Sequence, residues 1–133
     1  MPDPPDDALD DPSIPDRAAL WRRIAPRKEW VIFDENLGAS RATSAAFRDA
    51  SLSVILGDEV IESGRTVAGL LIPYPNYGMV EFAAELARRL GQIVRRDPTP
   101  EEPAHALVAG VKTRKTSSAF AKAARWIVRP NLS

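Results

Sequence analysis

A cluster of cations and hydroxyls near the C-terminal end is the part of this sequence best suited to binding chemistry. Its members are Lys112, Thr113, Arg114, Lys115, Thr116 and Ser117. They separate an apolar run over residues 104–111 from a predicted helix over residues 117–124. A helix start offers unpaired N–H groups and the positive end of the helix dipole, so we expect the cluster to hold a phosphate or carboxylate. It lacks the second glycine and the Gly-Lys-hydroxyl ending of a P-loop, which argues against a nucleoside triphosphatase. The alternative is a solvated, well-capped helix start.

The single histidine, His105, is the first candidate for acid–base catalysis. An imidazole titrates near neutral pH without a large perturbation. Asp34 and Glu35 follow an apolar run over residues 30–33 and are the carboxylates expected to pair with it. Turn formation explains the same two residues, and a structural hydrogen bond explains a histidine at the start of an apolar strand. The sequence therefore permits a small enzyme that uses His105 with Asp34 or Glu35.

Arg41 and Ser44 come shortly after the acidic loop and extend the set of candidate ligand-binding residues. Arg41 is placed either to bind an anion or to neutralise the loop through an exposed ion pair. The candidate nucleophiles are Ser44, Ser53, Ser117 and Ser118. No Gly-x-Ser-x-Gly elbow surrounds any of them, so the sequence permits a catalytic triad without indicating one.

Two tyrosines, Tyr74 and Tyr77, lie in the proline-rich segment Pro73–Gly78. Proline restricts the backbone of this loop, and rigid aromatic side chains lose little entropy when they are buried by a partner. We expect the loop to form a protein interface or, alternatively, to cover the hydrophobic core.

Composition limits the classes of protein that the chain can represent. Its 133 residues, of which 44% are hydrophobic, suit one domain with one core. The absence of cysteine excludes disulfides, thiolate zinc sites and iron–sulfur clusters. We expect neither a cofactor nor a metal; the alternative is magnesium bound by the acidic cluster Asp34, Glu35 and Asn36. No apolar run is long enough to span a bilayer, and the N-terminus is acidic where a secretory signal is basic. A soluble, cytoplasmic protein without a membrane partner is expected.

The net charge of zero conceals an asymmetry along the chain. The first fifteen residues form an acidic, proline-rich leader, whereas residues 112–129 contain basic residues and no acidic ones. We predict a flexible leader over residues 1–15 and a folded domain over residues 16–133. If the basic region binds nucleic acid, the leader is positioned in the sequence to compete for it, although no nucleic-acid motif is present.

The order of predicted elements favours the α+β class. We expect one compact domain with a mixed β-sheet and helices packed mainly on one face. Apolar spacing predicts a long helix over residues 79–96 in particular, with acidic residues early and arginines late. The other expected helices cover residues 17–24, 43–49 and 117–124, and the expected strands cover residues 30–33, 52–56, 67–72, 104–111 and 126–128.

Three stretches together carry a resemblance: Leu20-Trp21-Arg22-Arg23-Ile24, residues 30–47, and Pro103-Ala104-His105-Ala106 followed by Gly110 and Lys112. They look like a small uncharacterised bacterial protein family with no established function, and that likeness implies no activity. A weaker likeness is to ADP-ribosyltransferase-type toxins. It would use Arg22 or Arg23, Ser44 and Glu102.

The sequence thus leaves three hypotheses open. The first is an accessory module that binds a protein partner or an anionic ligand through the basic strand–helix junction and the tyrosine loop. The second is the small enzyme with His105. The third is a nucleic-acid-binding protein with an autoinhibitory acidic leader.

Overall fold

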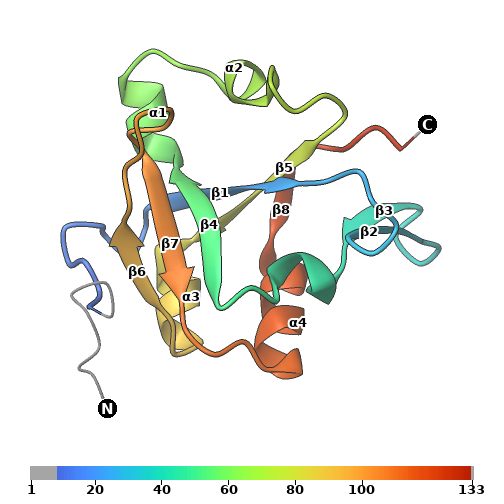
Figure 1. The fold of residues 1–133 in the computed structure, drawn as a ribbon. Helices are drawn as coiled ribbons and strands as arrows, with labels where there is room; N and C mark the ends of the chain where they lie inside the picture. Colours follow the sequence, from blue (N-terminus) through green and yellow to red (C-terminus); the bar gives the residue numbers. More distant parts are fainter. Residues whose placement is uncertain (1–8, 133) are drawn as a thin grey trace.

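A six-stranded antiparallel sheet forms the centre of the computed structural model, which describes residues 9–132 (Figure 1). The strands, in spatial order, are β6 (Ile93–Arg96), β7 (His105–Ala109), β4 (Ser51–Leu56), β1 (Ala19–Ile24), β5 (Gly78–Ala83) and β8 (Arg125–Val128). A separate hairpin is made by β2 (Val31–Asp34) and β3 (Ala39–Ala42). The α+β class and the single domain are confirmed. All pairings between the six strands are antiparallel, in place of the mixed sheet that was expected.

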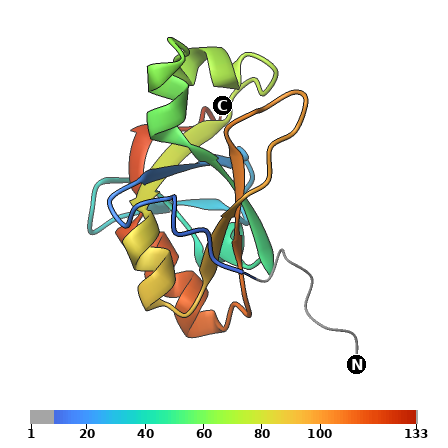
Figure 2. The ribbon, with the colours of Figure 1, turned by 90° about the vertical axis from the view of Figure 1, so that its left-hand side faces the viewer.

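The helices gather at two ends of the molecule. They are the 3-10 helix η2 (Ser44–Phe47), α1 (Gly57–Glu62), α2 (Val67–Leu71), α3 (Ala84–Arg89) and α4 (Arg114–Ala123). In both views α1 and α2 lie together at one end, and α3 and α4 lie at the other (Figures 1 and 2).

One face of the sheet carries the aromatic core. Because side chains alternate along a strand, Leu20 of β1 and its paired residues Leu56 and Phe82 point to the same side. Phe82 meets Phe120 of α4, with ring centroids 5.0 Å apart, and Phe120 stacks on Phe47 of η2 at 6.0 Å. These contacts fix η2 and α4 against this face.

The opposite face carries polar side chains beside apolar ones. Trp21 pairs with Ile55, and Ile55 pairs with His105, so these three residues share that face across β1, β4 and β7. Arg23 and Ser53 lie two residues along their strands from Trp21 and Ile55 and therefore point to the same side. The register thus places Arg23, Ser53 and His105 on one face, near α1 and α2.

Three predicted elements are wrong. The segment predicted as a helix over residues 17–24 contains strand β1, Ala19–Ile24. Leu20, Trp21, Arg22 and Ile24 are all buried, so this central strand shows no alternation of polar and apolar residues. The segment predicted as a strand over residues 67–72 contains helix α2, Val67–Leu71, and Thr66 caps this helix by accepting a hydrogen bond from Gly69 N.

The predicted long helix over residues 79–96 is wrong as well, and consists of β5, α3 and β6. The apolar residues of β5, α3 and β6 recur at helical spacing although the backbone changes conformation twice within this segment. Gly91, at φ +78°, lies beyond the end of α3 in a left-handed conformation that glycine adopts readily, and the chain then turns into β6. The predicted strands near residues 31, 52, 105 and 126 and the helix near residue 117 are confirmed.

The predicted leader lies partly outside the described residues, which begin at residue 9 and exclude Asp3, Asp6 and Asp7. Its later part is attached to the fold. Asp10 Oδ1 accepts hydrogen bonds from Val94 N at 2.8 Å and from Arg88 Nε at 3.1 Å. Ile14 is 1% exposed and belongs to the hydrophobic core, which therefore begins before residue 16.

None of the helices within residues 9–132 combines the length and the apolar character required to cross a bilayer.

Candidate functional site

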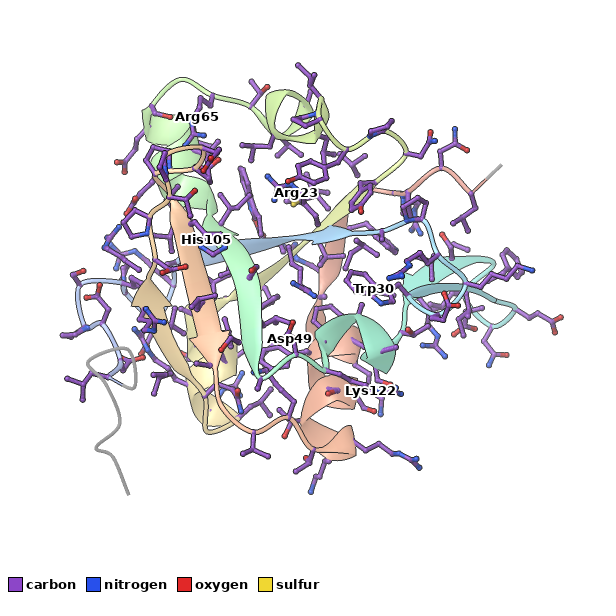
Figure 3. The ribbon with its side chains drawn as sticks, in the orientation of Figure 1. Arg23, Trp30, Asp49, Arg65, His105 and Lys122 are labelled. Carbon is purple, nitrogen blue, oxygen red and sulfur yellow. The ribbon has the colours of Figure 1, made fainter. Side chains whose placement is uncertain are left out.

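An open cavity of about 770 Å³ lies on the sheet face opposite the aromatic core, and we call it the Arg23 cavity. Arg23, Ser53 and His105 reach it from the sheet. Its remaining walls are the chain from Gly64 to Tyr74, which includes α2, and the loop that precedes β7. Figure 3 shows Arg23 between β1 and α2, with Arg65 near the end of α1. Segments distant in sequence thus meet around one opening.

Arg23 is the least satisfied cation of this cavity. Its guanidinium stacks on the ring of Tyr74, with Cζ 4.2 Å from the ring centroid. Its Nε is buried and has no hydrogen-bond partner, and within residues 9–132 the side chain makes no ion pair. A planar guanidinium held in this way keeps its donors for an oxyanion.

Arg65 and Glu102 form a bidentate ion pair in the wall of the cavity. Arg65 donates from both terminal nitrogens to the two carboxylate oxygens of Glu102, each at 2.8 Å, and Ala104 N donates to Glu102 Oε2 at 2.9 Å. The hydrogen bonds from Arg65 are the main cause that lowers the pKa of Glu102; desolvation opposes them, and the charge of Arg23 adds to the lowering. Glu102 is therefore near Arg23 but already paired with Arg65.

His105 is oriented by Asp97. Its Nδ1 lies 2.9 Å from the backbone oxygen of Asp97 and 3.1 Å from the carboxylate oxygen Oδ2. In return, Asp97 N donates to His105 O at 2.9 Å. These contacts occupy Nδ1 and leave Nε2 without a hydrogen bond to the described residues, on a ring that lines the cavity. The imidazole thus has one nitrogen fixed and one available for proton transfer.

The predicted partners of His105, Asp34 and Glu35, do not lie in this cavity. Asp34 Oδ1 accepts hydrogen bonds from Asn36 N at 2.9 Å and Leu37 N at 3.3 Å, and its Oδ2 pairs with Arg41 at 2.8 Å. Although desolvation acts to raise the pKa of Asp34, the bonds from Arg41 and the turn N–H groups lower it below its ordinary value. Asp34 therefore builds the β2–β3 turn, and Asp97 is the carboxylate beside His105.

The predicted anion site at the strand–helix junction is not assembled, because Lys112 points inward. Its Nζ donates to the carbonyl oxygens of Ala50 at 3.2 Å, Val108 at 3.0 Å and Gly110 at 3.1 Å. Burial lowers the pKa of Lys112 to about 8. The ammonium group of Lys112 is therefore bound to backbone carbonyls of the protein and is not directed toward a ligand.

The rest of that cluster is divided between the core and solvent. Ser117 is fully buried and donates to Phe47 O at 3.1 Å. Thr113 caps α4 by accepting from Thr116 N at 3.1 Å. Arg114 and Lys115 are exposed. The six residues therefore do not converge on one ligand position.

The other predicted residues fall in two places. Tyr74 lines the Arg23 cavity, and its ring centroid lies 5.2 Å from that of Tyr77; the interface proposed for this loop stays a prediction. Arg41 and Ser44 line a different cavity beside the β2–β3 hairpin. Of the residues that the toxin likeness would use, Arg23 and Glu102 share a cavity and Ser44 does not.

Sequence reasoning did not place Arg65 or Asp97 at a candidate site, and it named Arg23 only through the toxin likeness. No motif surrounds them, and the cavity depends on a register that places residues 23, 53 and 105 on one face of the sheet. The one available signal was local: Asp97 lies eight residues before His105, at the opposite end of the connection between β6 and β7. Among residues 9–132, no three histidine, aspartate or glutamate side chains gather as a metal site.

No family model matches this chain, and neither a curated protein nor a solved structure is significantly similar to it.

Proposed function

We propose that this chain binds a phosphorylated small molecule in the Arg23 cavity and hydrolyses its phosphate ester with His105 as the acid–base residue. The observation that supports binding most strongly is the buried Nε of Arg23 without a partner. A buried N–H left unsatisfied costs about 1–3 kcal/mol, and a ligand oxygen that accepts its hydrogen bond removes that cost. The cavity volume, about 770 Å³, lies within the range of small-molecule sites.

The charge balance of the cavity favours an anionic group at Arg23. Arg65 is neutralised by Glu102, whereas Arg23 has no direct carboxylate partner among the described residues. Stacking on Tyr74 holds the guanidinium plane, so little side-chain freedom remains to be lost on binding. A phosphate presents several oxygens to this fork and to the hydroxyl of Ser53, which also lines the cavity.

His105 supplies the proton transfer. In its protonated form, His105 gives a proton from Nε2 to the departing ester oxygen while water forms the new bond to phosphorus and the ester P–O bond breaks. The proton lost by the attacking water returns to the imidazole, so the enzyme is unchanged. Asp97 acts as a positioning residue, because its oxygens accept from Nδ1 and stabilise the imidazolium.

Phosphate release from a panel of sugar phosphates and nucleoside monophosphates tests the reaction. We expect His105→Asn to lower kcat about 100- to 10,000-fold, the range for loss of an acid–base group, while pyrophosphate still binds in calorimetry. Glu35→Gln is the matched control, because Glu35 is exposed and outside the cavity, and it should leave kcat unchanged. Full activity in His105→Asn, or no release from any of these esters by the wild type, would contradict the proposed reaction.

A further inference from the structure

A second cavity, of about 870 Å³, separates the β2–β3 hairpin from α4 and β8, and we call it the hairpin groove. Ile32 and Leu37 line it from the hairpin and are 39% and 66% exposed. Ala121 of α4 and Trp126 of β8 line the other wall. Apolar side chains therefore remain accessible to water on both sides of one groove, which is typical of a docking surface.

Basic side chains surround this apolar surface. Lys122 is exposed and makes no ion pair with the described residues. The Arg125 side chain is 78% exposed and pairs with Glu81 at 2.7 Å. Arg129 donates to Ser40 O at 2.7 Å, and its Cζ lies 5.8 Å from the Trp126 ring centroid. Neither contact pairs the charge of Arg129 with a carboxylate.

Arg41 is a fourth cation of the groove, and Asp34 already neutralises it. Lys122, Arg125 and Arg129 come from the stretch over residues 112–129, which contains no acidic residue. The groove therefore complements carboxylates placed beside apolar side chains.

The strand that forms one wall of the groove also favours an extended occupant. β8 is the last strand of the sheet, so within residues 9–132 one of its edges has no neighbouring strand. Backbone groups at such an edge can pair with an added strand, and Ile127 and Val128 are exposed beside them.

We propose that the hairpin groove binds an extended acidic peptide segment of a partner protein, with apolar residues between its carboxylates. The residues that line the groove favour a peptide over single-stranded nucleic acid, because sites for single-stranded nucleic acid use several aromatic rings on which successive bases stack. Among residues 9–132, Trp126 is the only aromatic residue that lines the groove, and its Nε1 donates to Ser40 O at 3.1 Å. The proposal does not depend on the Arg23 cavity.

Selection of phage-displayed random peptides on the full-length chain tests this proposal. We expect enriched peptides with alternating acidic and apolar residues. Fluorescence anisotropy of the synthetic peptides should show affinity lowered about 10-fold by Lys122→Glu and lowered by added salt, since reversing a charge at an interface replaces attraction by repulsion. Arg114→Glu is the control, because it makes the same charge change on α4 at a residue that does not line the groove.

Three results would overturn the proposal: no enriched peptide, enriched peptides without acidic residues, or equal loss of affinity in Lys122→Glu and Arg114→Glu. A labelled single-stranded oligonucleotide is measured alongside the peptides. If it binds more tightly than any of them and loses affinity in Lys122→Glu, the groove is a nucleic-acid site and the peptide proposal is wrong. Circular dichroism and thermal melting of both variants show whether the fold is intact.

Discussion

The strand–helix junction and the Arg23 cavity both contain basic residues, but only one of them leaves a buried donor unused. At the junction, Lys112 is surrounded by three backbone carbonyls of the same protein. In the cavity, Arg23 lies against Tyr74 with its Nε buried and unpaired. The local density of positive charge is higher at the junction, whereas the buried donor without a partner among the described residues is in the cavity.

This difference shows why a charge cluster in a sequence is a weak guide to a ligand site. A cation near unpaired carbonyls satisfies them and is no longer available to a ligand. A cation whose neighbouring carboxylate is already paired with another arginine, as Glu102 is with Arg65, keeps its donors for a ligand. Substitutions at Arg23, Glu102 and Lys112 test this difference, and the largest effect is expected in the cavity.

Replacing Arg23 should have the largest effect on ligand binding. We expect Arg23→Met to weaken pyrophosphate binding about 10- to 100-fold in calorimetry, because a hydrogen bond to a charged group contributes about 1.5–3 kcal/mol. Arg114→Gln, which removes a charge from the junction, serves as the matched control and should leave the affinity unchanged. If the two substitutions exchange these effects, the junction is the anion site.

Breaking the ion pair in the cavity wall should have an intermediate effect on stability. Glu102→Gln is expected to lower the free energy of unfolding in urea by about 1–2 kcal/mol, less than for a fully buried pair, because water screens the partly exposed Arg65. The folded-state pKa of Glu102 lies below its ordinary 4.5, so this contribution is present above pH 4.5 and is lost as the pH falls through the lowered pKa.

The difference between wild type and Glu102→Gln should therefore shrink in acid. Glu101→Gln is the control at the exposed neighbouring carboxylate, and its stability should follow that of the wild type. A pH-independent difference for Glu102→Gln would show that the carboxylate charge is not responsible.

The smallest effect is expected from the junction lysine, and it is a change of slope with pH. Burial lowers the pKa of Lys112 from 10.5 to about 8 in the folded state. Between these values the unfolded chain binds more protons, so the contribution of Lys112 to stability rises with pH. Urea unfolding of Lys112→Met should lack this rise between pH 8 and 10.5, whereas Lys115→Met should retain it. Parallel curves for wild type and Lys112→Met would show that Lys112 is not buried as described.

The fold class could be predicted from the sequence, whereas strand β1, which carries Arg23, and helix α2, which encloses the cavity, could not. β1 is buried on both faces, so the spacing of Leu20, Trp21 and Ile24 imitates a helix. The continuous apolar run over residues 104–111 predicts a strand, and β7 forms within it at His105–Ala109, alternating between buried and half-buried residues. The spacing of apolar residues does not distinguish a strand from a helix where a segment is buried on both faces.

The residues of the candidate site could be predicted only in part, because the sequence does not show how the strands pair. His105 and Tyr74 were singled out from their residue types, and both line the cavity. The spacing of residues 17–24 predicts a helix, and a helical Arg23 would not share a sheet face with Ser53 and His105. Asp34 is the predicted partner of His105, but its side chain accepts hydrogen bonds from its own turn. The sequence does not show that the connection between β6 and β7 brings Asp97 back beside His105.

The resonance of the Arg23 side-chain Nε–H group reports on anion binding in the cavity, since this buried donor has no hydrogen-bond partner within residues 9–132. In a nitrogen–proton NMR titration of the full-length protein with pyrophosphate, we predict a saturable shift of this resonance, absent in Arg23→Met, with little change at Arg114. An unmoved Arg23 resonance at saturating pyrophosphate, or equal shifts at both arginines, would contradict an anion site in the cavity.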